Sequence, residues 1–137
     1  MDSLIIRPLV ESDYDDILVG WWKQWDWDAP PRDFLPDDGK GGIMIMDGDT
    51  PVCAGFLYVT NSKASWVDWI ISNKEYNRKP HRKEAITLLI SKLTEISKNL
   101  GNKYAYALIK NKNLIKVYTD LGYANGDSYS EEMIKLL

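Results

Sequence analysis

The sequence is poor in the residues that build disulfides and metal sites. Among its 137 residues there is one cysteine, Cys53, and one histidine, His81. A single cysteine excludes an intramolecular disulfide, and one cysteine with one histidine cannot form a structural zinc site, which takes several such ligands. We therefore expect no metal.

Long apolar runs and an excess of positive charge are also missing. No stretch approaches the roughly 18 apolar residues of a membrane helix, and residues 1–8 lack the apolar run of a signal peptide. A net charge of -3 and a pI of about 5.1 give no general attraction to nucleic acid or anionic lipid. We expect a cytoplasmic protein with no nucleic-acid or membrane partner, either a monomer or a homodimer.

The composition that remains is that of an ordinary globular protein, with 45% hydrophobic and 27% charged residues. A chain of this length is typical of one domain, here residues 1–137. Periodicity predicts a strand over 4–7, then a helix with Ser12 as its N-cap and an apolar stripe that places Trp21, Trp22 and Trp25 in the core. The proline-rich segment 27–42 predicts a long loop.

Beyond that loop the pattern predicts a sheet with helices on its faces. Gly55 is a candidate position for a β-bulge. The expected strands are 43–46, 52–60, 65–71, 104–109 and 129–136, and the expected helices are 80–99 and 111–121.

The segment from Asn111 to Tyr123 carries the most specific local pattern. Its sequence NKNLIKVYTDLGY resembles the pattern N-x-x-A-I-x-L-Y-x-x-L-G-F of the GNAT acetyltransferase superfamily. The opening IIRPLVESDYDDI and the order of elements resemble the same family, and LPDDGKGG is similar to a segment of short phage-type members. The resemblance implies an α/β (α+β) GNAT fold, in which a mixed, mostly antiparallel sheet has helices on both faces.

The same resemblance implies an acyltransferase that moves an acetyl group from acetyl-coenzyme A to a primary amine of a small molecule or peptide. On the matching positions Tyr118 would give its proton to the departing thiolate, and Asn111 would face the pantetheine arm. Backbone groups of Ile70, Ile71 and Ser72 would bind that arm. The alternative for Tyr118 is simple packing on a helix face.

Asp68 interrupts an apolar strand, where a carboxylate costs energy unless it is solvated, paired or protonated. Many members of the resembled family carry an acid on this strand that takes the proton of the amine. Asp68 is therefore the first candidate for the general base and Glu75 the second. Alternatively, Asp68 pairs across the sheet or points to solvent.

The family's phosphate loop, R/Q-x-x-G-x-G/A, is altered in this sequence. An ungapped alignment puts Asn77, Pro80 and Arg82 at its three key positions, and proline has no N–H to offer a phosphate. With a short insertion, Arg82 takes the arginine position, and Ala85 and Thr87 take the small ones. Both registers stay open.

Cationic side chains are the expected substitute for the missing glycines, because they bind phosphate oxygens well. The candidates for binding coenzyme A here are Arg78, Lys79, His81, Arg82 and Lys83. The alternative for these side chains is a solvated helix start. The alternative for the whole chain is a catalytically inactive GNAT-like binding or interaction module.

Trp27 and Asp28 lie in the loop, outside the helical stripe. In the resembled family this region binds the acceptor. An acidic, aromatic entrance favours a cationic amine, so both are candidates for substrate binding.

Overall fold

The computed structural model describes residues 4–129 and 131–137. One five-stranded sheet has the order β1-β2-β3-β4-β5, antiparallel from β1 to β4 and parallel between β4 and β5. The strands are β1 (Leu4–Pro8), β2 (Gly42–Asp47), β3 (Thr50–Val59), β4 (Ala64–Ser72) and β5 (Tyr104–Tyr106). The helices are α1 (Glu11–Asp13), η1 (Tyr14–Leu18), α2 (Val19–Gln24), η2 (Arg32–Phe34), η3 (Pro36–Gly39), α3 (Lys79–Asn99) and α4 (Lys112–Asp120).

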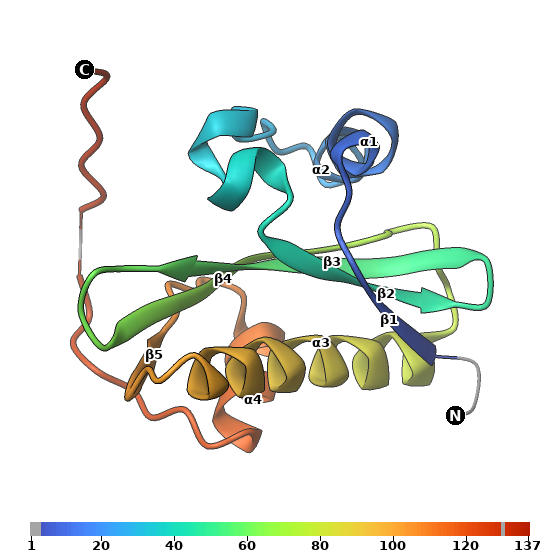
Figure 1. Ribbon diagram of the computed structural model, residues 1–137. Helices are drawn as coiled ribbons and strands as arrows, with labels where there is room; N and C mark the ends of the chain where they lie inside the picture. The colour runs from blue at the N-terminus through green and yellow to red at the C-terminus, as the bar shows by residue number, and fades with distance from the viewer. Residues whose placement is uncertain (1–3, 130) are drawn as a thin grey trace.

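Helices cover both faces of the sheet (Figure 1). The segment from α1 to η3 lies on one face, and α3 and α4 lie on the other. Each face has its own core: Trp21, Trp22 and Phe56 pack on the first, while Leu89, Ile90 and Val67 pack on the second. The expected mixed, mostly antiparallel sheet with helices on both faces is confirmed.

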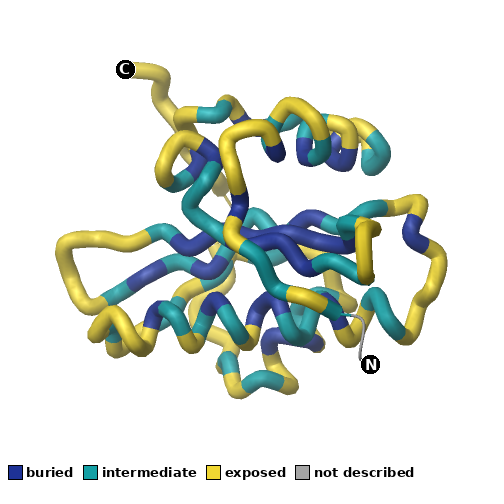
Figure 2. The backbone as a smooth tube through the Cα atoms, turned by 45° about the vertical axis from the view of Figure 1, so that its right-hand side comes forward, coloured by how far each residue is buried: buried dark blue, intermediate teal, exposed yellow. Residues whose placement is uncertain are grey.

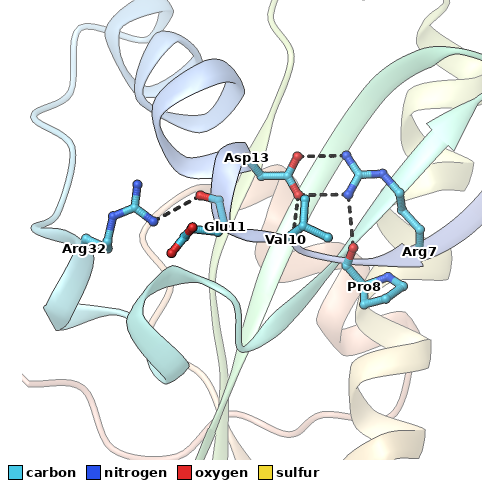
Figure 3. Close-up of polar contacts among 6 residues, drawn as sticks. All are labelled: Arg7, Pro8, Val10, Glu11, Asp13 and Arg32. Carbon is cyan, nitrogen blue, oxygen red and sulfur yellow. Dashed lines mark hydrogen bonds and ion pairs between the residues drawn. The ribbon is translucent and has the colours of Figure 1, made fainter.

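The first helix begins two residues earlier than the Ser12 cap predicts, with Val10 at the N-cap position. The N–H of Val10 donates to Asp13 Oδ2 at 2.8 Å, so the carboxylate of Asp13 reaches back to the residue before α1. Asp13 also accepts two hydrogen bonds from Arg7, at 2.8 and 2.9 Å (Figure 3). Ser12 is wrong as the cap because Asp13, with a longer reach and a charge, fixes the chain between β1 and α1.

The loop predicted over residues 27–42 is present, but it contains the short helices η2 and η3. The loop ends at Gly42, the first residue of β2, where a Cβ atom would lie 2.0 Å from the carbonyl oxygen of Gly55 on β3. Only glycine permits that approach.

The C-terminal part departs most from the sequence-based expectation. β5 ends at Tyr106 rather than at residue 109, and the strand predicted over 129–136 is wrong. Residues 129 and 131–136 lie outside every helix and strand, and Ser130 lies outside the described residues. β5 ends early because the N–H of Leu108 donates to the carboxylate of Asp68, at 3.1 Å, instead of to a strand neighbour.

None of the helices described in this structure is long and apolar enough to cross a membrane.

Candidate functional site

A cavity of about 500 Å³ opens where the end of β4 meets α3 and α4. Its lining is divided by chemistry. Apolar side chains come from Trp25, Trp27, Ile70, Ile71, Ile86, Leu114 and Val117, and polar ones from Ser72, Lys79, Arg82, Lys83, Asn111, Asn113 and Lys116. We call it the β4–α3–α4 cavity. One ligand with an apolar and an anionic part would match both kinds of lining residue.

A bulge in β4 creates this space. The pairing of β3 with β4 shifts register between Ala54 and Phe56, and Trp69 adopts a φ of 56°. Pairing between β4 and β5 stops at Trp66 and Tyr106, so the two strands separate before β4 reaches the cavity. Gly55, the predicted bulge position, lies on β3 opposite the extra residue of β4. A Cβ atom on Gly55 would lie 2.5 Å from Ile70 Cδ1.

Arg82 holds the β4–α3 loop, residues 73–78. Its Nη2 donates to the carbonyl oxygens of Asn73 at 3.2 Å, Lys74 at 3.0 Å and Tyr76. Its Nε is buried without a hydrogen-bond partner. No carboxylate among the described residues forms an ion pair with this guanidinium. Arg82 therefore shapes the loop through neutral carbonyls and leaves its positive charge at the cavity.

Four cations line the cavity together: Lys79, Arg82, Lys83 and Lys116. No aspartate or glutamate is among the lining residues. A local group of positive charges in a chain of net charge -3 attracts anions, and phosphate oxygens are strong acceptors for such donors.

Two tryptophans form the wall on the side of α2. The rings of Trp25 and Trp27 stack with centroids 5.9 Å apart, and Trp25 Nε1 donates to the carbonyl oxygen of Ser72 at 2.9 Å. Trp27 is 52% exposed. Trp21 and Trp22 are buried as predicted, but Trp25 is only partly buried because it ends the helical stripe at the cavity.

Asp68 lies on β4 just before the bulge and outside the cavity lining. Its carboxylate accepts hydrogen bonds from the N–H groups of Trp69, at 2.9 Å, and Leu108, so it bridges from β4 to the segment after β5. Burial raises the pKa of Asp68, and the two N–H donors offset only part of that effect. The charge of Asp68 raises in turn the pKa values of Tyr58 and Tyr118, which burial has already raised.

Tyr118 is buried, and its hydroxyl donates to the carbonyl oxygen of Val67 at 2.7 Å. Burial, followed by the charge of Asp68, raises its pKa well above the usual tyrosine range, so the phenol keeps its proton at neutral pH. Leu114 and Val117, on the same helix, line the cavity, whereas Tyr118 does not. Its role as a proton donor stays a prediction.

Asn111 combines two positions. It is the N-cap of α4, where its Oδ1 accepts a hydrogen bond from the N–H of Leu114 at 3.0 Å, and it also lines the cavity. The cap fixes the end of α4 that borders the cavity.

The structure separates the other predicted site residues from the cavity. Arg78 forms an ion pair with Asp47 of β2 at 2.9 Å, and His81 is half-buried with its Nδ1 unpartnered. Glu75 and Asp28 are exposed in loops. None of these four lines the cavity, whereas Ile70, Ile71, Ser72, Lys79, Arg82, Lys83, Asn111 and Trp27 do.

The start of α3 bears on the two registers of the phosphate loop. α3 begins at Lys79, so residues 77–82 span the turn from loop to helix. Ala85 and Thr87 lie inside the helix, and the Thr87 hydroxyl donates to the carbonyl oxygen of Lys83. The three key positions of the ungapped register thus lie at the turn, and those of the gapped register lie within the helix.

Sequence reasoning missed several lining residues of the cavity: Trp25, Ile86, Asn113, Leu114, Lys116 and Val117. Lys116 follows Lys112 by four residues on α4, which places both on one helix face, but only the packing of α4 against α3 turns Lys116 toward the cavity.

No protein-family model and no curated protein sequence matches this chain. Solved structures do match. The ribosomal-protein-S18-alanine N-acetyltransferase of Escherichia coli gives a TM-score of 0.71 at 13% identity over 90% of this chain and 79% of its own. A GNAT family acetyltransferase of Staphylococcus aureus gives 0.60 at 16% identity over 96% and 99%.

A third match is the N-acetylglutamate synthase of Neisseria gonorrhoeae, solved in complex with coenzyme A and L-arginine. It gives a TM-score of 0.71 at 10% identity and covers 93% of this chain, which spans 28% of that protein. The chain also spans only 45% of an acetyltransferase structure from Pyrococcus horikoshii. At identities this low, the matches establish the fold.

Proposed function

Because the chain has the fold of the GNAT acetyltransferases, we propose that it binds acetyl-coenzyme A in the β4–α3–α4 cavity and transfers the acetyl group to a primary amine. One observation carries the proposal: the same cavity is lined by apolar side chains and by four cations. That combination suits a ligand with a long flexible arm and a phosphorylated end.

The residues present fit such a ligand. Ile70, Ile86 and Val117 offer apolar contacts to the arm, and Ser72 and Asn111 offer polar ones. Bound acetyl-coenzyme A would supply the acetyl group as a thioester. Lys79, Arg82 and Lys83 would bind phosphate oxygens at the start of α3, where the helix dipole also favours negative charge.

An anion at this position would also offset an unfavourable electrostatic interaction between these cations and the helix dipole. Lys79, Arg82 and Lys83 lie at the positive end of the α3 dipole, where each cation costs about 0.3 to 1 kcal/mol. Phosphate groups would reverse that cost.

Asp68 is the candidate base. A carboxylate whose pKa is raised by burial accepts a proton from an amine more readily than an ordinary aspartate does. The bridge to Leu108 keeps it at the point where β4 and β5 separate. Tyr118 is the candidate acid, because its raised pKa keeps the proton on the phenol until it is transferred.

Acetyl transfer can be tested with acetyl-coenzyme A and a panel of amines: peptide N-termini, lysine side chains, polyamines and amino sugars. Product is detected by mass spectrometry. We expect Asp68→Asn and Tyr118→Phe each to lower kcat by about a hundredfold while binding of coenzyme A stays within about threefold of the wild type. Glu75→Gln is the matched control and should leave kcat unchanged.

The second candidate is an inactive module that only binds the coenzyme. It is favoured by the engagement of the Tyr118 hydroxyl with Val67 and by Pro80, which has no N–H at the turn. Binding of coenzyme A without transfer to any amine would support this candidate. Transfer that Asp68→Asn leaves unaffected would remove Asp68 as the base.

A further inference from the structure

The β4–α3 loop, residues 73–78, is anchored to the hairpin of β2 and β3. The loop and the turn of this hairpin lie side by side at one end of the sheet (Figure 1). Asn73, at the start of the loop, donates from its N–H to the carbonyl oxygen of Val52 at 2.8 Å and from its Nδ2 to that of Pro51 at 3.2 Å. The other half of the loop is held at Asp47, the last residue of β2. The hairpin therefore holds the loop at both ends.

Tyr76 makes the buried part of the anchor at Asp47. It is the one buried residue of an otherwise exposed or half-buried loop (Figure 2). Its hydroxyl donates to Asp47 Oδ2 at 2.6 Å, and the side chain of Asp47 is only 9% exposed. Arg78 Nη1 donates to the same oxygen at 2.9 Å, but the Arg78 side chain is 53% exposed. Because solvent screens an exposed ion pair, Tyr76 is the main link between the hairpin and the loop.

The backbone of Tyr76 continues this link to Arg82. The carbonyl oxygen of Tyr76 is one of the three loop carbonyls that accept hydrogen bonds from Arg82 Nη2. A chain of contacts thus runs from Asp47 through Tyr76 to the Arg82 guanidinium, which lines the cavity. Neither Asp47 nor Tyr76 is among the lining residues. Asp47 can therefore act on a bound anion by placing Arg82 rather than by touching the anion.

An anion site made of side chains needs this support more than a site made of backbone does. Backbone N–H groups in a loop are fixed by the chain, whereas an arginine side chain has several rotatable bonds and loses that freedom when it binds a ligand. Holding the guanidinium in place before binding lowers this cost. At this turn Pro80 has no N–H to offer, so the site depends all the more on how well Arg82 is held.

We propose that Asp47 is a positioning residue for the β4–α3–α4 cavity: through the Tyr76 hydroxyl it fixes the loop carbonyls that hold the Arg82 guanidinium in place. Asp47 lies on β2, far along the chain from the residues that line the cavity, so the hairpin serves as the rigid support of the site. The effect on coenzyme A rests on the proposed function, whereas the ordering of Arg82 needs no ligand. The two parts are therefore measured separately.

NMR relaxation of the Arg82 Nε–H group measures the ordering of Arg82 in the chain without ligand. The signal is assigned by its absence from Arg82→Ala. We expect a high order parameter in the wild type and in the matched control Arg78→Ala, and a lower one in Tyr76→Phe, which keeps the buried ring and removes only the hydroxyl. Asp47→Ala should lower it in the same way. The proposal is overturned if Arg82 is as ordered in Tyr76→Phe as in the wild type, or if it is already mobile in the wild type.

Calorimetry with coenzyme A tests the consequence for binding in a double-mutant cycle. Tyr76→Phe should lower the affinity by about three- to tenfold in the wild-type background and by less than about twofold in the Arg82→Ala background, because it acts through Arg82. A loss by the same factor in both backgrounds, or in neither, would show that Tyr76 does not act through Arg82. If the wild type binds no coenzyme A, the proposed function fails, and the relaxation measurement alone decides whether Asp47 orders Arg82.

Discussion

Two arginines stabilise two connections between a strand and a helix, and they do so in opposite ways. We call these connections the Arg7 corner, between β1 and α1, and the Arg82 corner, between β4 and α3. Arg7 forms an ion pair with Asp13, a carboxylate whose side chain is only 4% exposed, and the pair joins β1 to α1. Arg82 instead bonds three neutral carbonyl groups of the β4–α3 loop. At the Arg7 corner the positive charge is neutralised by a carboxylate, whereas at the Arg82 corner a positive charge without an ion pair among the described residues lies beside a cavity.

The difference separates a structural ion pair from a site prepared for an anion. At the Arg7 corner, removing a partner leaves a buried charge uncompensated, so the fold should suffer. Loss of Arg82 leaves no carboxylate of the described chain without its cation, but it removes hydrogen bonds to three loop carbonyls, so it should affect the loop and a bound anion more than the rest of the fold.

The largest effect should come from Arg7→Met, which leaves the buried carboxylate of Asp13 without its cation. We expect it to lower the free energy of unfolding by about 3 kcal/mol, at the low end for buried pairs because Arg7 is 30% exposed. Urea titration measures the change. The matched control is Arg78→Met, whose arginine is 53% exposed in its ion pair with Asp47. If both variants lose the same stability, the greater burial of the Arg7–Asp13 pair does not set its contribution to the fold.

The next effect should come from Arg82→Ala, which removes the uncompensated cation. Affinity for coenzyme A should fall by about 10- to 100-fold, and Arg82→Lys should restore only part of it, because the ammonium group of lysine lacks the planar guanidinium that binds two phosphate oxygens at once. Arg78→Ala should bind nearly as well as the wild type, because Arg78 is directed to Asp47. Calorimetry measures the three affinities. If Arg78→Ala and Arg82→Ala lost the same affinity for coenzyme A, the place of each arginine relative to the cavity would not determine its contribution to binding.

A smaller effect should appear in the dependence of stability on pH. Burial alone would raise the pKa of Asp13, but the hydrogen bonds from Arg7 and Val10 outweigh it, and the pKa is lowered. A lowered pKa stabilises the fold above the unfolded value of about 3.9, and that stability is lost as pH falls through the folded value. Asp13→Asn should therefore lose less stability than the wild type between about pH 5 and pH 2.

Asp68 should act in the opposite sense. Its raised pKa means that the folded state binds the proton more tightly, so protonation stabilises the fold as pH falls through the folded value. Thermal unfolding of Asp68→Asn against pH measures this contribution. A wild-type profile that matches that of Asp68→Asn would contradict the raised pKa.

The smallest effect should come from Trp27→Ala. Trp27 is 52% exposed and stacks on Trp25, so its removal takes away one flank of the cavity and leaves the core intact. Affinity for coenzyme A should fall by about two- to fivefold, with unfolding unchanged. Trp22→Ala is the contrasting variant. The Trp22 side chain is 1% exposed, so its removal should destabilise the fold instead.

The sequence predicted the fold well because the fold depends on periodic patterns. The stripe of Leu89, Ile90 and Leu93 specifies α3, and the segment from Asn111 to Tyr123 specifies α4 and its cap. The pattern could not show that residues 131–136 lack a neighbour, because strand propensity says nothing about which edge is within reach.

The candidate site was predicted only in part, since adjacent cations look alike in a sequence. Arg78 and Arg82 have the same chemistry and lie one turn apart, yet one turns to Asp47 and the other to the loop carbonyls. Lys116 joins the cavity from α4, about thirty positions along the chain, through a tertiary contact that no local pattern reveals.

Titration of coenzyme A into the wild-type chain by calorimetry, beside Lys83→Glu with Lys116→Glu, tests most directly whether the uncompensated cations form an anion site. We expect one molecule bound per chain in the micromolar range, weakening as salt is added, and no measurable binding to the charge-reversed variant. The account would be contradicted if the wild-type chain bound no coenzyme A at millimolar concentration. It would also be contradicted if the charge-reversed variant were folded and bound coenzyme A with the same affinity as the wild type.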